Sequence, residues 1–64
     1  MKFKYQSKVI KQEGRYIITE RLDTDGFFEL SWIRNDGRPV FLKTNNRMER
    51  MEELLQMALD GKDI

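Results

Sequence analysis

Glu20 is the side chain of this sequence that comes nearest to a catalytic group. Strand alternation places it between Ile18 and Leu22, on the side of a predicted sheet that should be covered, with Ser7 as its expected neighbour. A carboxylate buried there would have a raised pKa and could act as an acid. Because an unpaired buried charge costs several kcal/mol, such a group more often pairs with a neighbour such as Ser7 or Arg47, or with water. We therefore expect a structural role for Glu20.

The residue types that carry most enzyme chemistry are absent from the sequence. It contains no Cys and no His, which excludes disulfides, thiolate metal sites and imidazole catalysis. Phosphate-binding loops and nucleophile elbows have no signature here. Asp23, Asp25 and Asp36 lie near tight turns, where Asp is favoured, and their spacing is not that of a metal-binding loop. The sequence predicts a protein that is not an enzyme and has no catalytic residues, metal or other cofactor.

Basic and aromatic side chains indicate a different chemistry, the binding of single-stranded nucleic acid. Residues 1–44 carry nine Lys or Arg against six Asp or Glu, whereas residues 45–64 carry three against five. Lysines could contact phosphates, and aromatic rings could stack on bases. Lysines on an edge strand also prevent aggregation between sheet edges, and this simpler interpretation is favoured. The candidate nucleic-acid-binding residues are Lys4, Lys8, Arg21, Phe27, Phe41 and Lys43.

The elements that would position these residues are four strands followed by one helix. Breaks that contain Gly divide the first part of the chain into segments with strand alternation, at about 2–12, 15–23, 27–34 and 39–44. The apolar period then becomes helical over about 47–60, with Asn46 as the expected N-cap and Gly61 after the last turn. Residues 62–64 are expected to fray. We predict an α+β fold, in one domain of residues 1–64, in which a four-stranded antiparallel meander of order 1-2-3-4 packs one C-terminal helix on one face.

Turn lengths decide which side chains share a face of this sheet. The lengths that best match apolar residues across the strands are two residues at Glu13-Gly14 and three residues around both Asp25-Gly26 and Asp36-Gly37. The pairs they predict are Val9 with Ile18, Ile10 with Ile17, Ile18 with Trp32, Arg21 with Glu29, Trp32 with Val40, and Leu30 with Leu42.

These registers assign apolar side chains to both faces of the sheet. The helix stripe should cover one face and form the core with it. The strand residues expected in that core are Phe3, Tyr5, Val9, Tyr16, Ile18, Leu22, Phe28, Leu30, Trp32, Val40 and Leu42. The helix residues expected to meet them are Met48, Met51, Leu54, Leu55, Ala58 and Leu59.

The other face has an apolar cluster at one end and nothing in the sequence to cover it. A contiguous exposed patch on so small a domain usually marks an interface. The favoured occupant is a second copy of the chain, because a two-fold contact buries the same patch twice. A different protein, a nucleic acid or ligand, and a curled sheet that buries the patch internally are the alternatives. The predicted interface residues are Ile10, Ile17, Ile33, Pro39 and Phe41.

The order of four strands and one helix resembles the repeat unit of the Whirly and PUR-type single-stranded nucleic-acid-binding proteins, which function as dimers or paired repeats. The resemblance covers the layout of most of the chain, and no individual residue is carried over. No apolar run approaches the roughly 20 residues that span a bilayer, and the chain starts directly in strand alternation, so a soluble cytoplasmic protein is expected. The predicted function is that of a small regulatory or adapter module acting by protein–protein contact, as a homodimer or with another protein. The alternative is single-stranded nucleic-acid binding.

Overall fold

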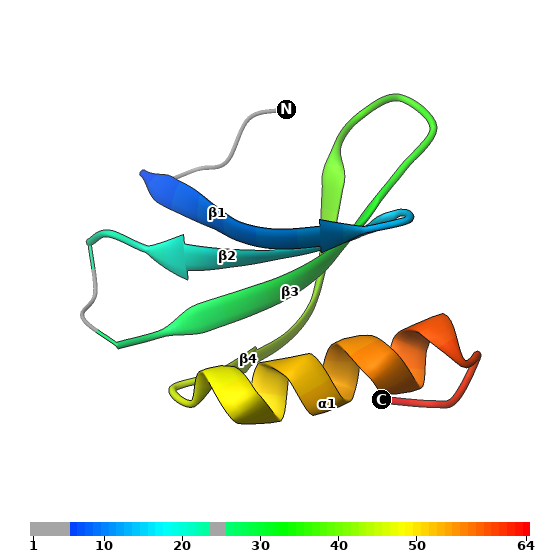
Figure 1. Cartoon of the computed structure of the whole chain (residues 1–64). Coiled ribbons are helices and arrows are strands. Elements are labelled where there is room, and N and C mark those ends of the chain that lie inside the picture. Colours follow the sequence, from blue (N-terminus) through cyan, green and yellow to red (C-terminus); the bar gives the residue numbers. More distant parts are fainter. Residues whose placement is uncertain (1–5, 24–25) are drawn as a thin grey trace.

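The computed structural model describes residues 6–23 and 26–64 of the chain. Four strands form one antiparallel sheet in the order β1-β2-β3-β4, and one helix follows them (Figure 1). The helix contacts β2, β3 and β4, and Figure 1 shows β1 and the loop between β3 and β4 farthest from it. The predicted α+β meander with a C-terminal helix is confirmed. Its elements are β1 (Ser7–Glu13), β2 (Tyr16–Arg21), β3 (Phe28–Ile33), β4 (Pro39–Asn45) and α1 (Met48–Leu59).

The turn between β1 and β2 has the predicted length of two residues, but it is centred one residue later. Glu13 pairs with Tyr16, so Gly14 and Arg15 form the turn. Gly14 has φ +58, as the first central residue of a type II′ turn requires. A turn centred on Glu13 and Gly14 would have forced a positive φ on Glu13 in either hairpin type. The predicted pairs of Val9 with Ile18 and Ile10 with Ile17 are therefore wrong.

A β-bulge then changes the faces of β1. Val9 pairs with Thr19 and Lys11 with Ile18, so Ile10 is the extra residue of the bulge. Val9 consequently lies on the face opposite the helix, although it was expected in the core. Lys8 pairs with Glu20 and moves to the side that bears the helix.

The register of β2 with β3 differs from the prediction by two residues. Ile18 pairs with Leu30 instead of Trp32, and Glu29 pairs with Thr19 instead of Arg21. Because the difference is even, every side chain of these two strands keeps the face that the sequence assigned to it. The backbone N–H of Arg21 donates to the carbonyl of Phe27 at 3.1 Å and closes the connection.

The register of β3 with β4 begins as predicted and then shifts. Trp32 pairs with Val40, which is confirmed, but Leu30 pairs with Lys43 because Leu42 is the extra residue of a second bulge. Leu42 still packs against the core. Beyond the bulge, Thr44 pairs with Glu29 on the face opposite the helix.

The sequence predicted the C-terminal end of α1 correctly but placed its N-cap one residue too early. Its N-cap is Arg47, not Asn46, and the Arg47 backbone N–H donates to Asn45 Oδ1 at 2.9 Å. At the other end Gly61 has φ +78, and the N–H groups of Gly61 and Lys62 donate to the carbonyls of Ala58 and Met57. This is a Schellman motif, which confirms the predicted Gly61 terminus.

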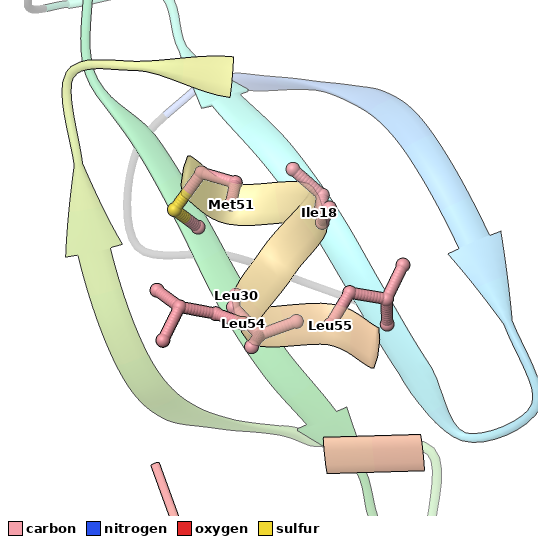
Figure 2. Packing of buried hydrophobic residues seen from close by; sticks show 5 residues of the cluster. All are labelled: Ile18, Leu30, Met51, Leu54 and Leu55. Atoms are coloured by element: carbon pink, nitrogen blue, oxygen red, sulfur yellow. The ribbon is translucent and has the colours of Figure 1, made fainter. Parts of the chain in front are cut away.

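The core lies between α1 and the two central strands. Ile18, Leu30, Met51, Leu54 and Leu55 form it, and Figure 2 shows them converging from the helix and the sheet. The residues that pack around this cluster are Tyr16, Phe28, Leu42, Met48 and Ile64. The contact of Ile64 means that the expectation of a frayed C-terminus is wrong for this residue.

Besides Val9, three residues expected in the core lie largely outside it. Leu22, Val40 and Leu59 are each more than one third exposed. A helix of 12 residues spans about 18 Å, so it covers only the middle of the sheet. Phe3 and Tyr5 lie outside the described residues.

Candidate binding surface

The face of the sheet opposite α1 is called here the helix-free face. Strand alternation and the two bulges determine its members, because each bulge reverses the faces of an edge strand beyond it. Its strand residues are Ser7, Val9, Gln12, Ile17, Thr19, Arg21, Glu29, Ser31, Ile33, Pro39, Phe41 and Thr44.

The centre of the helix-free face is buried although no helix covers it. Ile17 and Thr19 are 0% exposed, and Ser31 and Glu29 are also buried. All four belong to the central strands, and side chains of both edge strands flank them. Figure 2 shows the edge strands β1 and β4 bowed around the central pair. The expectation that Ile17 is part of an exposed patch is wrong, because its neighbours in this chain already cover it.

Exposed apolar side chains border this buried centre. Phe41 of β4 is 54% exposed and Val9 of β1 is 50% exposed, and they lie on opposite edges. Phe27, just before β3, is also exposed. Large apolar side chains on two edges of one face give a partner apolar area to bury.

The five predicted interface residues have different environments. Phe41 is exposed, and Ile33 and Pro39, which pair with each other beside it, are half-buried. Ile10 is exposed in the β1 bulge, and Ile17 has no exposed surface. The structure thus brings Ile33, Pro39 and Phe41 together at one end of the helix-free face, and their role in an interface stays a prediction.

Two buried polar groups face each other at the centre of the helix-free face. Thr19 and Glu29 pair directly across β2 and β3, which places their Cβ atoms about 4.5–5.5 Å apart. Thr19 Oγ1 and Glu29 Oε1 are both buried and have no hydrogen-bond partner in the described part of the chain. Burial raises the pKa of Glu29 above its ordinary value, because the charged form loses solvation.

This carboxylate was not singled out from the sequence. Glu20, the predicted buried carboxylate, is half-buried and pairs with Lys8 and Phe28, not with Ser7. Glu29 alternates with apolar residues and resembles an ordinary solvent-facing residue of a half-buried strand. Thr19 and Ser31, two small polar residues on the same face of the central strands as Glu29, are the signal that could have identified Glu29 as a buried carboxylate.

The candidate nucleic-acid residues are divided between the two sides of the sheet. Lys8 pairs with Glu20, and Lys43 pairs with the core residue Leu30, so both belong to the side that bears the helix. Phe41 and Arg21 lie on the helix-free face, where Arg21 donates to Asp23 at 3.0 and 2.6 Å. Phe27 is exposed beside β3, and Lys4 lies outside the described residues. Lys8 and Lys43 therefore do not contribute to the basic surface that was predicted on the face opposite the helix.

A polar depression lies at the start of α1 and is lined by Asn45, Arg47, Glu49, Arg50 and Glu53. Its charged side chains are already paired, Arg47 with Glu49 and Arg50 with Glu53. Within residues 6–23 and 26–64, no three acidic side chains cluster in a way that could hold a metal ion. In the same ranges, no helix has the length and apolarity needed to cross a bilayer.

Comparison of the chain with protein-family models, curated proteins and solved structures yields no significant match.

Proposed function

We propose that this protein is a small non-catalytic module that acts by protein–protein contact through its helix-free face. The observation that supports the proposal is the combination of exposed Phe41 and Val9 with two buried polar atoms, Thr19 Oγ1 and Glu29 Oε1, that have no hydrogen-bond partner within residues 6–23 and 26–64. Interfaces typically join apolar contact area to a few hydrogen bonds that fix the register of the partner. The helix-free face offers both.

The occupant is either a second copy of the chain or a different protein. A two-fold dimer was the expectation from the sequence, and the Ile33, Pro39 and Phe41 end of the face is where such a dimer would be centred. A dimer centred on Glu29 would instead bring two carboxylates together, which is unfavourable. A different protein has no such restriction, and the geometry favours it.

Single-stranded nucleic-acid binding has less support than protein contact. Lys8 and Lys43 lie on the other side of the sheet, and the buried Glu29 would repel phosphates. This alternative stays a prediction.

Photo-crosslinking tests the proposed contact. A benzophenone side chain would replace Phe41 in one variant and the exposed helix residue Glu52 in the other. We expect a protein adduct from position 41 only. An excess of the unaltered chain should suppress the adduct, and an excess of the Phe41→Ser chain should not. Val40→Ser is the matched competitor control, because Val40 is the preceding residue on the opposite side of β4.

Light scattering on the same samples identifies the occupant. An adduct of twice the chain mass, together with a dimer in solution, would assign the surface to a second copy. An adduct of another mass and a monomer in solution would assign it to a different protein. Equal adducts from positions 41 and 52, or no competition by the unaltered chain, would contradict the proposal.

A further inference from the structure

Glu29 has no cationic partner within the described residues of this chain. No hydrogen bond or ion pair of Glu29 is present among them, and its Oε1 is buried. Arg21, which lies on the helix-free face two residues along β2 from Thr19, is held by Asp23 at 2.6 Å. Thr44, the neighbour of Glu29 on β4, directs its hydroxyl to the carbonyl of Phe28 at 2.8 Å. Residues 6–23 and 26–64 therefore bury a carboxylate without providing its counterion.

A buried, unpaired carboxylate lowers the stability of a protein unless a partner supplies the missing charge or donors. Thr19 Oγ1 on the adjacent strand is also unpartnered and faces the same side, so a hydroxyl oxygen that can accept a hydrogen bond lies beside the carboxylate. A guanidinium or ammonium group has several N–H donors and no acceptor, which matches such a pair. Hydrogen bonds between charged groups are also stronger than those between neutral groups.

We propose, on the basis of the function proposed above, that the protein partner of the helix-free face inserts an Arg or Lys side chain against Glu29 and Thr19. Its neighbouring apolar residues then cover Val9 and Phe41 on either side. Glu29 sets the charge of the group that is accepted, Thr19 provides a second acceptor, and the two exposed side chains provide apolar contact area.

Charge complementarity favours this occupant over the two others. A second copy docked symmetrically over the centre presents its own Glu29 carboxylate, and the Arg21 of that copy is already paired with Asp23. A nucleic acid presents phosphates to the same carboxylate. A basic side chain of a different protein is the group that satisfies Glu29 without placing like charges together.

A small cation tests the site without knowledge of the partner. The probe is butylguanidinium chloride, titrated into the full-length chain and followed by backbone amide NMR, with butanol as the uncharged control of the same chain length. We expect saturable shifts centred on Thr19, Glu29 and Ser31, with a dissociation constant of about 1–10 mM because the probe is small. Butanol should not produce the same pattern.

Three variants make the result specific. Glu29→Gln should weaken the binding of butylguanidinium about tenfold or more, and Thr19→Val should weaken it several-fold. Glu52→Gln, at an exposed carboxylate on α1, should leave it unchanged. Amide spectra of each variant establish that it is folded. Equal binding by the Glu29→Gln chain, or shifts spread over all carboxylates without saturation, would overturn the proposal.

The outcomes separate this inference from the proposed function. One outcome is that position 41 crosslinks a protein competitively while butylguanidinium does not bind at Glu29. In that case the proposed protein contact is retained, and the proposal that the partner inserts an Arg or Lys side chain is rejected. If butylguanidinium binds at Glu29 but no competitive adduct forms, the cation site stands and the contact with a protein is wrong.

Discussion

The two faces of the central strands are both buried, but they are built from different side chains. On the helix-bearing face, five apolar residues of β2, β3 and α1 form a cluster. On the helix-free face, the same two strands bury Thr19, Glu29 and Ser31 beside Ile17. Apolar burial stabilises the fold, whereas burial of an unpaired carboxylate costs stability. The comparison shows that one face supplies the apolar packing between the helix and the sheet, whereas the other buries two polar atoms that have no hydrogen-bond partner among the described residues.

Truncation of the helix-bearing core should have the largest effect. Leu30→Ala removes a side chain that is fully buried between β3 and α1. We expect it to lower the free energy of unfolding by about 2–5 kcal/mol. A domain of this size has only about 3–5 kcal/mol of stability, so much of the variant should be unfolded at 25 °C. Urea unfolding, followed by the fluorescence of Trp32, measures the change.

Val9→Ala is the control from the helix-free face. Val9 is an exposed strand residue on an edge, so its truncation should change the free energy of unfolding by less than about 0.5 kcal/mol. If Val9→Ala cost as much as Leu30→Ala, the distinction between a stabilising face and a contact face would be wrong.

Removal of the buried carboxylate should raise the free energy of unfolding, whereas truncation of the core lowers it. Glu29→Leu replaces an unpaired buried group by an apolar one, and we expect a gain of about 1–3 kcal/mol in the free energy of unfolding at pH 8. The gain should depend on pH, because burial raises the pKa of Glu29 above its ordinary value of 4.5. The folded chain then holds this proton to higher pH than the unfolded chain. The stability associated with Glu29 is therefore full below pH 4.5 and is lost as the pH rises through the folded-state pKa.

Denaturant unfolding from pH 4 to pH 8 tests this sign. The difference between Glu29→Leu and the unaltered chain should grow from pH 4.5 upward and then become constant. Taking the difference is necessary because Asp23, whose pKa Arg21 lowers, changes stability in the opposite sense with pH. A difference that is independent of pH would show that Glu29 is not desolvated in the folded chain.

The end of α1 provides a smaller test of the helix-bearing face. Gly61 has φ +78, a conformation that disfavours any side chain, and it directs the chain back so that Ile64 contacts the core. Gly61→Ala should lower the free energy of unfolding by about 1 kcal/mol. Lys62→Ala, at an exposed neighbour, should change it by much less, as judged by thermal unfolding in circular dichroism. Equal effects would show that the Schellman geometry is not important for stability.

The sequence predicts the element order and the faces of β2 and β3 because these depend on alternation alone. Ile18 and Leu30 meet the helix although the register between their strands differs by two residues, since an even shift preserves the faces. Gly61 is also predicted correctly, because the need for a positive φ is local to the helix end.

The bulges and the buried carboxylate could not be predicted in the same way. Ile10 and Leu42 look like ordinary strand residues, and their extra positions depend on how the edge strands curve around the centre. Each bulge reverses the faces of its strand beyond it. As a result, Val9, Lys8, Lys43 and Thr44 lie on the face opposite to the one that unbroken alternation predicts. The burial of Glu29 depends on side chains of neighbouring strands, so strand alternation cannot distinguish it from an exposed residue.

The smallest effect is expected in a test of nucleic-acid binding. A positive result there would change the contrast between the two faces of the sheet more than any other result. We expect an oligothymidine to show no retardation by the chain at 50 mM salt. Lys8 and Lys43 lie across the sheet from Phe41, and Glu29, on the same face as Phe41, would repel phosphates. Lys8→Glu should then change nothing in electrophoresis at low or high salt. Retardation that weakens steeply with salt and is lost in Lys8→Glu would mean that the helix-bearing side binds nucleic acid. The contact surface would then have to be assigned to that side, and the buried, unpaired carboxylate of the helix-free face would need another explanation.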